Sequence, residues 1–401
     1  MRDMSILMAL QRFFRVQGAW KLLAAMLVYG CGTGILNPMN AIYLKDGVHL
    51  VKFQISAVVA IALVVNVVIT FFSGLWSDKM AHRKILPVVA SAVSVFGLIG
   101  YDHASGFASA VTFYILSTAP SGAIIGQLYA MARSHLALEA PDIAEIGIVW
   151  LRTLLSVGFF IGLYLGTALY TWVTFHGVIL GNLVCYALMF FLFLLYRERR
   201  GPVIAKRLPE EGVQWVVLIA ILSLLCADAI RGLYLPLMVD SLFKNPALVA
   251  RLWSVQVVFE FIWMTVAGMA ARRFGDLRVV SVGAACALVT YCVYAFHPSL
   301  PLLFVVQPIY SFFVSVIMIV AMGMIQRMFL SRAGFGSSLY FVLSQSAALI
   351  GYLVPNLISG FSPHIFYIPS MLMVVSVTLC IGQIYKNSRT GTASSSVHEV
   401  S

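Results

Sequence analysis

Twelve long apolar stretches follow one another along this chain, separated by short polar segments. Each has about 20 residues, the helix length needed to cross the roughly 30 Å hydrocarbon core of a bilayer. The pattern therefore predicts an all-α membrane protein with twelve transmembrane helices. The predicted spans are 20–43, 53–75, 85–101, 107–131, 145–167, 174–196, 214–238, 252–271, 279–296, 302–325, 335–358 and 365–385.

The composition supports a chain embedded in lipid. Hydrophobic residues make up 61% of the 401 positions and charged residues only 10%, which excludes an ordinary soluble globular domain. The net charge of +11 raises nucleic acid as a partner, but the basic residues are dispersed in short loops instead of being clustered. We therefore expect this protein to contact the lipid bilayer and not nucleic acid.

The distribution of Lys and Arg predicts the orientation of the spans. Placing the N-terminus inside puts most basic residues in cytoplasmic segments, as the positive-inside rule requires, and leaves only Lys45, Lys52, Lys244 and Arg251 outside. An even number of spans then places both termini in the cytoplasm. The basic, amphipathic N-terminus is expected to be a surface helix leading into span one, because its apolar continuation is too long for a signal peptide.

The chain divides between the sixth and seventh predicted spans. The connection RERRGPVIAKRLPEEG is the longest polar one and combines a Gly-Pro pair with a dense run of charges. GLWSDKMAHRK after span two is echoed by GMAARRFGDLR at 268–278 after span eight. The expected organisation is a cytoplasmic amphipathic segment at 1–19, six-helix bundles at 20–196 and 214–385, a central cytoplasmic loop at 197–213, and a disordered cytoplasmic tail at 386–401.

The loop after span two contains a specific motif. Gly-x-x-x-Asp-(Arg/Lys)-x-x-x-Arg-(Arg/Lys) at this place resembles the motif of the major facilitator superfamily of secondary transporters, with Ala81 where that family usually has Gly. An ordinary basic cytoplasmic loop is the alternative. We expect the glycine to allow close helix approach, the aspartate to pair with a helix end or an Arg, and the basic residues to hold the loop in the cytoplasm. The motif residues are Gly74, Asp78, Lys79, Arg83 and Lys84.

Four charged side chains are the best candidates for the interior of predicted spans, where each should face the protein interior and have a partner. Asp228 and Arg231 are three residues apart on one face of span seven, close enough to neutralise each other. One interpretation is an internal ion pair whose only role is to allow this span to insert into the membrane. A role of Asp228 in proton coupling, with Arg231 in the substrate cavity, is the other.

Glu260 in span eight has no basic neighbour one turn away, so its partner comes from another helix or it is protonated. We expect it to be the main proton-coupling residue. Arg152 lies one or two turns into span five, where it either extends to the cytoplasmic interface or serves as a cation of the substrate cavity. The distance to the interface favours the cavity.

Uncharged polar side chains are spread over several spans. Any single one is more often a hydrogen bond between helices than a ligand. Together they fit a cavity, between the two halves near the midplane, that binds a neutral polyhydroxy solute. The candidates are Asn37, Asn66, Gln127, Gln256, Gln307 and Gln345.

Several short segments in both halves resemble the sugar efflux transporter family. They are VVNVVITFFSGLWSD, GQLYAMAR at 126–133, FEFIWMTVAGMAARRFG at 259–275 and LSRAGFGSSLY at 330–340. The resemblance implies the major facilitator fold and a bacterial inner-membrane exporter that exchanges sugars or glycosides for protons. Asn66, Gln127, Arg152 and Glu260 stand at matching intramembrane positions, whereas the two charges of span seven depart from the expected pattern.

The expected function is thus proton-coupled efflux, by antiport, of sugars, glycosides or a related small polar metabolite by alternating access. Efflux of drugs or siderophores, and uptake by proton symport, remain alternatives, and a non-transporting scaffold is a further one. An enzyme is not expected, because the chain lacks a His-Glu-x-x-His or paired-carboxylate motif. The six cysteines form no Cys-x-x-Cys pair, so no metal or cofactor is expected. A monomer is the default state for this architecture.

Overall fold

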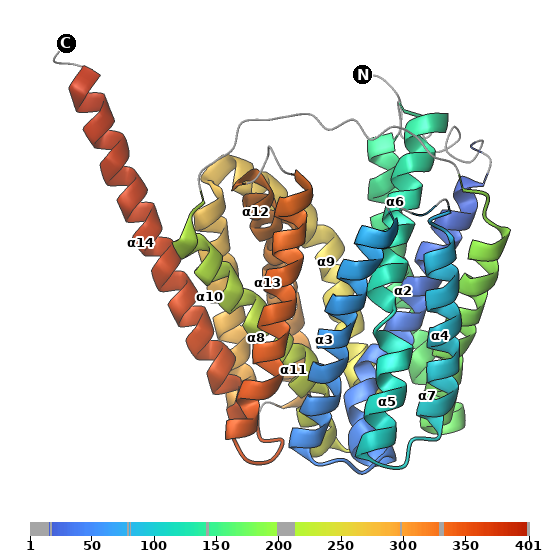
Figure 1. The fold of residues 1–401 in the computed structure, drawn as a ribbon. Coiled ribbons are helices and arrows are strands. Elements are labelled where there is room, and N and C mark those ends of the chain that lie inside the picture. Colours follow the sequence, from blue (N-terminus) through green and yellow to red (C-terminus); the bar gives the residue numbers. More distant parts are fainter. Residues whose placement is uncertain are drawn as a thin grey trace. The chain divides into compact units, whose positions relative to one another are not determined.

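The computed structural model describes residues 16, 18–77, 80, 82–141, 144–198, 213–296, 299–328 and 333–398 (Figure 1). Helices make up nearly all of these ranges, and they contain no strand. Almost all of the predicted amphipathic segment and most of the predicted central loop lie outside the described residues.

Ten helical segments in the described part are long and apolar enough to cross a membrane. Two places account for the difference from the twelve predicted spans. Trp150–Leu195 is one candidate where the sequence predicts two spans, and no candidate coincides with the predicted span 335–358. The count of twelve therefore stays a prediction.

The chain divides into two compact units. Unit 1 comprises Met1–Ala205 and Asn245–Arg251, and unit 2 comprises Lys206–Lys244 and Leu252–Ser401. Each unit has its own helices and its own buried polar groups, and each is described by itself below.

In unit 1, α2 lies along α7, α4 packs on α5 and α7, and α3 packs on α5 and α6 (Figure 1). The single stretch predicted at 107–131 contains two helices, because Pro120 lacks the backbone N–H that would continue the first of them. The elements are α2 (Ala19–Ile42), the π-helical turn η1 (Tyr43–Gly47), α3 (Lys52–Ser77), α4 (Ile85–Asp102), α5 (Phe107–Thr118), α6 (Ser121–Glu139) and α7 (Ala144–Leu195).

Helix α7 consists of two helices joined at Thr174. This residue has φ 64° and ψ −152°, which is not a helical conformation. The part before Thr174 corresponds to the predicted span 145–167, and the part after it to 174–196. The kink therefore falls where the sequence predicts a connection between two spans.

Glycines bring α2 and the first part of α7 into backbone contact. A Cβ atom added at Gly34 would lie 2.2 Å from the carbonyl oxygen of Phe159, and one at Gly162 would lie 2.2 Å from that of Cys31. Gly30 and Gly158 are equally confined by backbone atoms of the opposite helix. Small residues four apart on both helices permit this approach, as is common between transmembrane helices.

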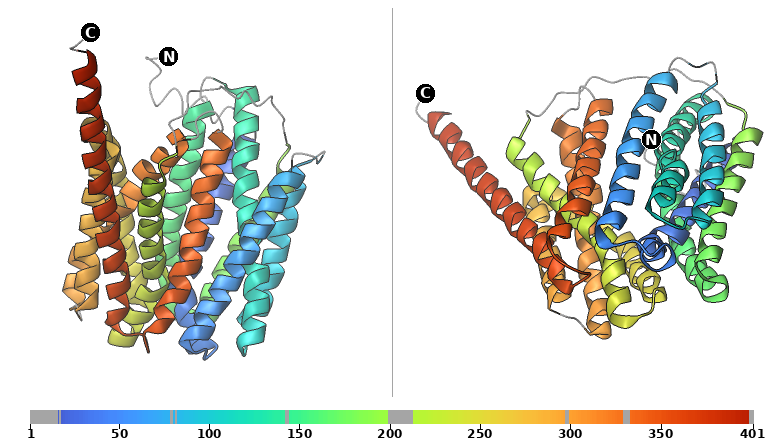
Figure 2. Two further views of the ribbon diagram at one scale, coloured as in Figure 1. Left: turned by 60° about the vertical axis from the view of Figure 1, so that its left-hand side comes forward. Right: turned by 60° about the horizontal axis from the view of Figure 1, so that its bottom comes forward.

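In unit 2, α14 packs on α8 and α10, α13 packs on α8, and α10 packs on α11 (Figures 1 and 2). The π-helical segment η2 continues α11 directly into α12. The elements are α8 (Trp215–Phe243), α9 (Ala247–Phe274), α10 (Asp276–Ala295), α11 (Leu300–Ser315), η2 (Val316–Ala321), α12 (Met322–Met328), α13 (Ala333–Leu353), the 3-10 turns η4 (Val354–Leu357) and η5 (Pro363–Phe366), and α14 (Tyr367–His398).

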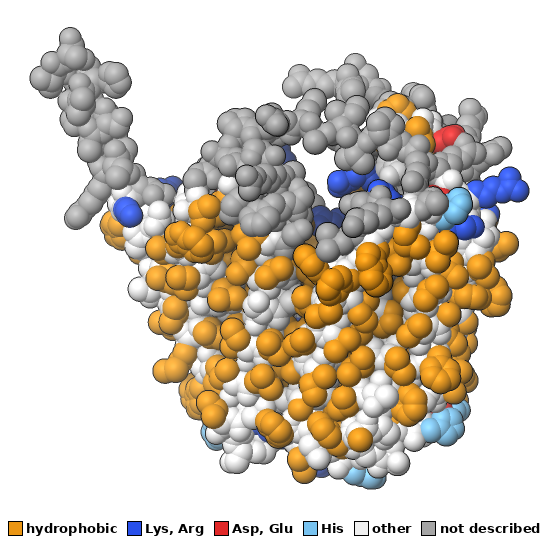
Figure 3. Space-filling model, viewed as in Figure 1, with side chains coloured by type: hydrophobic (Ala, Val, Ile, Leu, Met, Phe, Trp, Pro, Cys, Tyr) orange, Lys and Arg blue, Asp and Glu red, His pale blue; other side chains and the backbone are white. Residues whose placement is uncertain are grey.

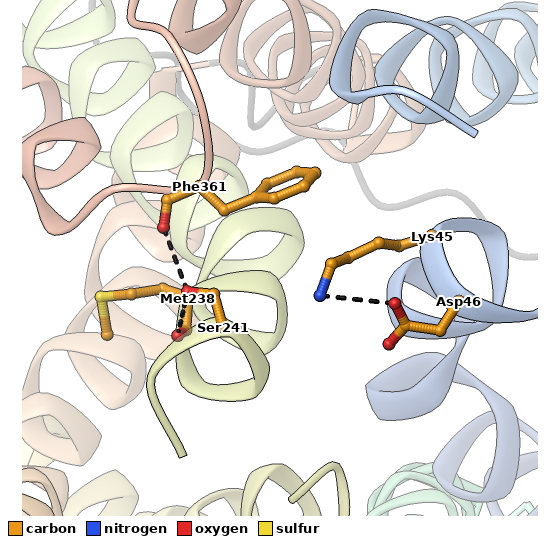
Figure 4. A network of polar contacts seen from close by, with 5 residues as sticks. All are labelled: Lys45, Asp46, Met238, Ser241 and Phe361. Carbon is orange, nitrogen blue, oxygen red and sulfur yellow. Dashed lines mark hydrogen bonds and ion pairs between the residues drawn. The ribbon is translucent and has the colours of Figure 1, made fainter. Parts of the chain in front are cut away.

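Figure 4 shows polar contacts near the end of one helix in unit 2 and within one helical turn in unit 1. In unit 2, the Ser241 hydroxyl donates to the carbonyl oxygens of Met238, at 2.8 Å, and Phe361, at 3.4 Å, tying the loop before α14 to the end of α8. In unit 1, the Lys45 ammonium lies 3.4 Å from the carboxylate of Asp46 within η1.

The outward faces of the helices are apolar. Large side chains such as Phe71, Phe96, Val305 and Met371 are more than half exposed, and hydrophobic side chains are spread over the face of the molecule that Figure 3 shows. This surface is suited to hydrocarbon and not to water. Helix α14 runs to His398, where the sequence predicts a disordered tail from Lys386; the segment contains no proline that would end the helix.

Candidate functional site

The two charges of α8 are connected through Tyr310 of α11. The Tyr310 hydroxyl donates a short hydrogen bond to Oδ1 of Asp228. The face of the same ring lies 3.9 Å from the guanidinium carbon of Arg231, which is a cation–π contact. Tyr310 is fully buried and Arg231 is only 3% exposed. One aromatic residue therefore contacts both the acid and the base.

Arg231 has a second partner on α11. Its Nη2 donates to Oε1 of Gln307 at 2.9 Å. The amide nitrogen of Gln307 in turn donates to the Tyr294 hydroxyl and to the Leu303 carbonyl oxygen, both at 2.9 Å. We call Asp228, Arg231, Tyr294, Gln307 and Tyr310 the α8–α11 network. It leaves Arg231 Nε as a buried donor without a hydrogen-bond partner among the described residues.

The structure corrects the predicted ion pair on one face of α8. Asp228 and Arg231 make no charged contact within 4.0 Å. Spacing along one helix allows such a pair, but the phenol and the amide of α11 offer each charge a closer partner. Because Arg231 and Gln307 are both buried and bonded to each other, neither side chain is open to a solute in this structure.

Glu260 lies in a second polar group, between α9 and α11. Gln256, one turn before it, donates to Oε1 of Glu260 at 2.6 Å. The Ser311 hydroxyl donates to the backbone oxygen of Gln256 at 2.8 Å, and Trp263 donates to that of Pro308 at 2.9 Å. These bonds fix α9 against α11. No Lys or Arg among the described residues lies within ion-pair distance of the Glu260 carboxylate.

Two of the predicted unit 1 residues are held inside the bundle. Asn66 of α3 donates to the carbonyl oxygen of Ala119 at 2.8 Å and to the Ser121 hydroxyl at 3.2 Å, at the break between α5 and α6. Gln127 of α6 is 4% exposed, and its Oε1 has no hydrogen-bond partner among the described residues. An unsatisfied buried acceptor is costly, so Gln127 is a place where a solute or water hydroxyl would be stabilised.

Three predicted cavity residues are more open. Arg152 is exposed on α7. Asn37 of α2 is also exposed, and Gln345 of α13 is half-buried. Neither of these amides hydrogen-bonds to another described residue. The predicted cavity residues thus divide between the two units, and each group is described within its own unit.

The loop motif is described in part. Asp78 and Lys79 lie outside the described residues. A Cβ atom added at Gly74 would have no neighbour within 4 Å among the described residues. Close helix approach at Gly74 therefore stays a prediction, whereas the glycines of α2 and α7 do bring two helices of unit 1 into contact.

The basic part of the motif secures helix ends. The Lys84 ammonium donates to the carbonyl oxygens of Leu194, at 3.4 Å, and Tyr196, at 3.0 Å, at the C-terminus of α7. Arg83 Nε donates to the carbonyl oxygen of Ser77 at the end of α3, at 3.3 Å. A cation stabilises the negative end of a helix dipole, so both residues have a defined structural role.

Sequence reasoning missed Tyr294 and Tyr310. Their signal is spacing: Gln307, Tyr310 and Ser311 recur at three and four residues, which places polar groups on one face of an otherwise apolar helix. In the part of the chain that the structure describes, no three His, Cys, Asp or Glu side chains are grouped as metal ligands.

Comparisons with known proteins agree with this architecture. A protein of Deinococcus radiodurans named "Putative sugar efflux transporter" is 21% identical over 369 residues, covering 88% of this chain and 94% of that protein. A crystal structure of a mutant of the nucleoside transporter NupG aligns with a TM-score of 0.77 at 12% identity, covering 92% of this chain and 99% of that one.

Another crystal structure, of a bacterial homologue of the iron transporter ferroportin in an inward-facing state, aligns with a TM-score of 0.68 at 17% identity, over 92% of this chain and 98% of the other. At these identities the solved structures show the fold alone. The profile of the Major Facilitator Superfamily matches residues 22–263, which is more than half of the chain. This helical, multi-pass membrane protein therefore belongs to the Major Facilitator Superfamily, a family of transporters and not of enzymes.

Proposed function

We propose that this protein is a secondary transporter of a bacterial inner membrane that exports sugars or glycosides in exchange for protons, by alternating access and as a monomer. The family membership and the printed name of the Deinococcus relative support this proposal. In this superfamily, two bundles rock about a substrate site near the midplane. The cytoplasmic orientation of both termini is part of the proposal.

The observation on which the proposal rests is the isolation of the Glu260 carboxylate. It lies in a membrane-spanning helix and has the Gln256 amide as its side-chain partner, with no cation in ion-pair distance among the described residues. An intramembrane carboxylate in this setting is costly when charged. It can therefore take up a proton in one conformation and release it in another, where its surroundings become more polar.

Asp228 is the second proton-coupling candidate, but its setting is different. The Tyr310 hydroxyl bonds to it, and Arg231 next to Tyr310 supplies a compensating positive charge. The α8–α11 network is therefore balanced without a change of protonation. We assign proton exchange to Glu260, and assign Asp228 the task of holding α8 against α11.

The character of the polar side chains favours a neutral cargo. Gln127 has an unsatisfied buried oxygen, Gln256 has another, and amides of this kind bind the hydroxyl groups of sugars. Asn37 and Gln345 are further amides with free hydrogen-bonding groups in the described structure. The exposed Arg152 is the observation that favours a charged cargo, such as an acidic drug or a siderophore, as the second candidate.

The test is transport in proteoliposomes with labelled sugars, glycosides, drugs and siderophores. Wild type is compared with Glu260→Gln in two assays, counterflow exchange and accumulation driven by an imposed pH gradient. We expect Glu260→Gln to keep counterflow, because the site still binds cargo, and to lose accumulation, because the amide cannot carry a proton. This combination separates coupling from binding and from folding.

Two further variants act as controls. Asp102→Asn removes a unit 1 carboxylate that pairs with His176, and should leave both assays unchanged. Asp228→Asn should mainly lower protein stability, with a smaller effect on accumulation driven by the pH gradient. If Glu260→Gln accumulates cargo as well as wild type while Asp228→Asn does not, the proton site is Asp228 and our assignment is wrong. If no tested sugar or glycoside moves but a siderophore does, the cargo proposal fails.

A further inference from the structure

A cavity of about 430 Å³ opens at one end of unit 2, away from Glu260 and from the α8–α11 network. It lies where α8 begins, α9 ends, α10 begins and α12 ends, with the wall completed by α14. Residues from each of these elements line it, among them Gln214, Phe274, Arg278, Met324, Arg327 and Ile384. By the orientation proposed above, this is the cytoplasmic end.

The cavity has one paired and one unpaired arginine. Arg327 forms a short charge-assisted hydrogen bond to the carboxylate of Asp276, which also lines the cavity. Arg278 is exposed and makes no hydrogen bond or ion pair with another described residue. The net charge of the three side chains is positive, and a free guanidinium is a strong, geometrically specific partner for a phosphate group.

The surroundings of the cavity place it at a membrane interface. Trp215 at the start of α8, Phe274 at the end of α9 and Tyr385, next to the lining residue Ile384 in α14, are exposed by 72%, 53% and 70%. Aromatic residues of this kind gather at the level of lipid headgroups. Phe274, Met324 and Ile384 give the cavity an apolar part beside its arginines. A soluble phosphate has no apolar group to bury in that part of the cavity, but a glycerophospholipid has its glycerol and acyl chains.

We propose that this cavity binds the phosphodiester headgroup of an anionic phospholipid of the cytoplasmic leaflet. Arg278 contacts the phosphate, Arg327 supplies a second positive charge, and the glycerol and upper acyl chain lie on the apolar side. Basic pockets between transmembrane helices on this side of a membrane are suited to such headgroups. The bound lipid would join α8, α10, α12 and α14 at one end of unit 2.

The full-length protein is reconstituted in nanodiscs containing equal amounts of phosphatidylglycerol and phosphatidylcholine, and co-purified lipid is measured by native mass spectrometry. Arg278→Gln is compared with Arg272→Gln, a change of another exposed arginine that does not line the cavity. We expect Arg278→Gln to bind phosphatidylglycerol about tenfold more weakly, because one charge-assisted contact is lost. Arg272→Gln should bind like wild type.

Asp276→Asn is a second variant, and its expected effect on lipid binding is the opposite of that of Arg278→Gln. It removes the negative charge of the cavity and releases Arg327, so retention of phosphatidylglycerol should rise. Equal retention by wild type, Arg278→Gln and Asp276→Asn would overturn the proposal. Displacement of the lipid by millimolar inorganic phosphate would show that free phosphate is the ligand, and would also overturn it. Because transport is not measured, the result is independent of the proposed cargo and coupling.

Discussion

Tyr310 shows how a single buried side chain can hold two charges inside a membrane protein. Its hydroxyl bonds to Asp228 while its ring contacts Arg231, so neither charge needs to reach the other directly. Arg231 also donates a hydrogen bond to the Gln307 amide oxygen. The acid and the base compensate each other through Tyr310. Burying both charges together therefore costs less free energy than burying either one alone.

This arrangement predicts a strongly non-additive effect of mutations. Asp228→Asn or Arg231→Gln alone leaves one buried charge uncompensated, and should lower the free energy of unfolding by about 3–5 kcal/mol. The double variant removes both charges and should lose less than the sum of the single losses. The measurement is denaturant or thermal unfolding in detergent for the four proteins of the double-mutant cycle.

Additive losses in that cycle would contradict a shared network. Glu260→Gln is the matched comparison, because it removes a carboxylate that has no compensating cation nearby in the described structure. It should therefore leave stability unchanged or raise it, in contrast to Asp228→Asn.

At this scale the sequence predicts which charged side chains lie inside helical spans more readily than it predicts their hydrogen-bond partners. Placing Asp228, Arg231 and Glu260 inside spans follows directly from hydropathy, because few charges interrupt the apolar stretches. Their partners do not follow, because Tyr310 is 82 residues away from Asp228 along the chain. Helical spacing suggested the pairing of Asp228 with Arg231, and the structure puts α11 side chains in contact with both.

At the scale of elements, the contact of α2 with α7 depends on glycine. The Gly34 and Gly162 positions leave no room for a Cβ atom, because a carbonyl oxygen of the opposite helix lies 2.2 Å from where it would be. We expect Gly34→Ala to destabilise the protein by about 1–3 kcal/mol, since the helices must move apart. The measurement is the unfolding midpoint in detergent.

Gly126→Ala is the matched control for this prediction. Gly126 is also a helical glycine of unit 1, in α6, and an added Cβ atom would have no neighbour within 4 Å. The change should leave stability unchanged or raise it slightly, because alanine is the better helix former. Equal midpoints for Gly34→Ala and Gly126→Ala would show that α2 and α7 can separate at no cost.

The sequence also indicates only in part which side chains contact the ends of helices. The motif predicted that Lys84 belongs to a basic loop, and the structure shows its ammonium at the C-terminus of α7, more than a hundred residues away. The close helix approach expected at Gly74 stays a prediction, and an added Cβ atom there would have no neighbour within 4 Å among the described residues. A glycine in a motif permits close approach but does not by itself create a neighbouring helix.

At the scale of the whole molecule, the alternation of apolar stretches and basic loops predicts the path of the chain through the membrane. Green fluorescent protein fused after Ser401 should fluoresce, because the C-terminus is expected in the cytoplasm. Alkaline phosphatase inserted after Gly360, in the loop between α13 and α14, should be active outside. Activity and fluorescence in whole cells are the measurements.

Phosphatase inserted after Gly275, between α9 and α10, is the control and should be inactive, because that loop is expected in the cytoplasm. An inactive insertion after Gly360, combined with a C-terminus that does not fluoresce, would show that α14 crosses the membrane and α13 does not. The count of twelve spans would then be wrong. The ten candidates found from the described helices already single out α13 as the helix to test.

The sequence by itself determined that this protein lies in a membrane, that it is helical and that it belongs among the major facilitators, because apolar length, loop charge and a loop motif are local properties of the chain. The tertiary structure alone decided that Tyr310 connects Asp228 with Arg231, that glycines of α2 and α7 touch, and that Arg278 and Arg327 line one cavity. These features depend on which helices are neighbours, and neighbours are chosen by the packing of side chains from distant parts of the chain.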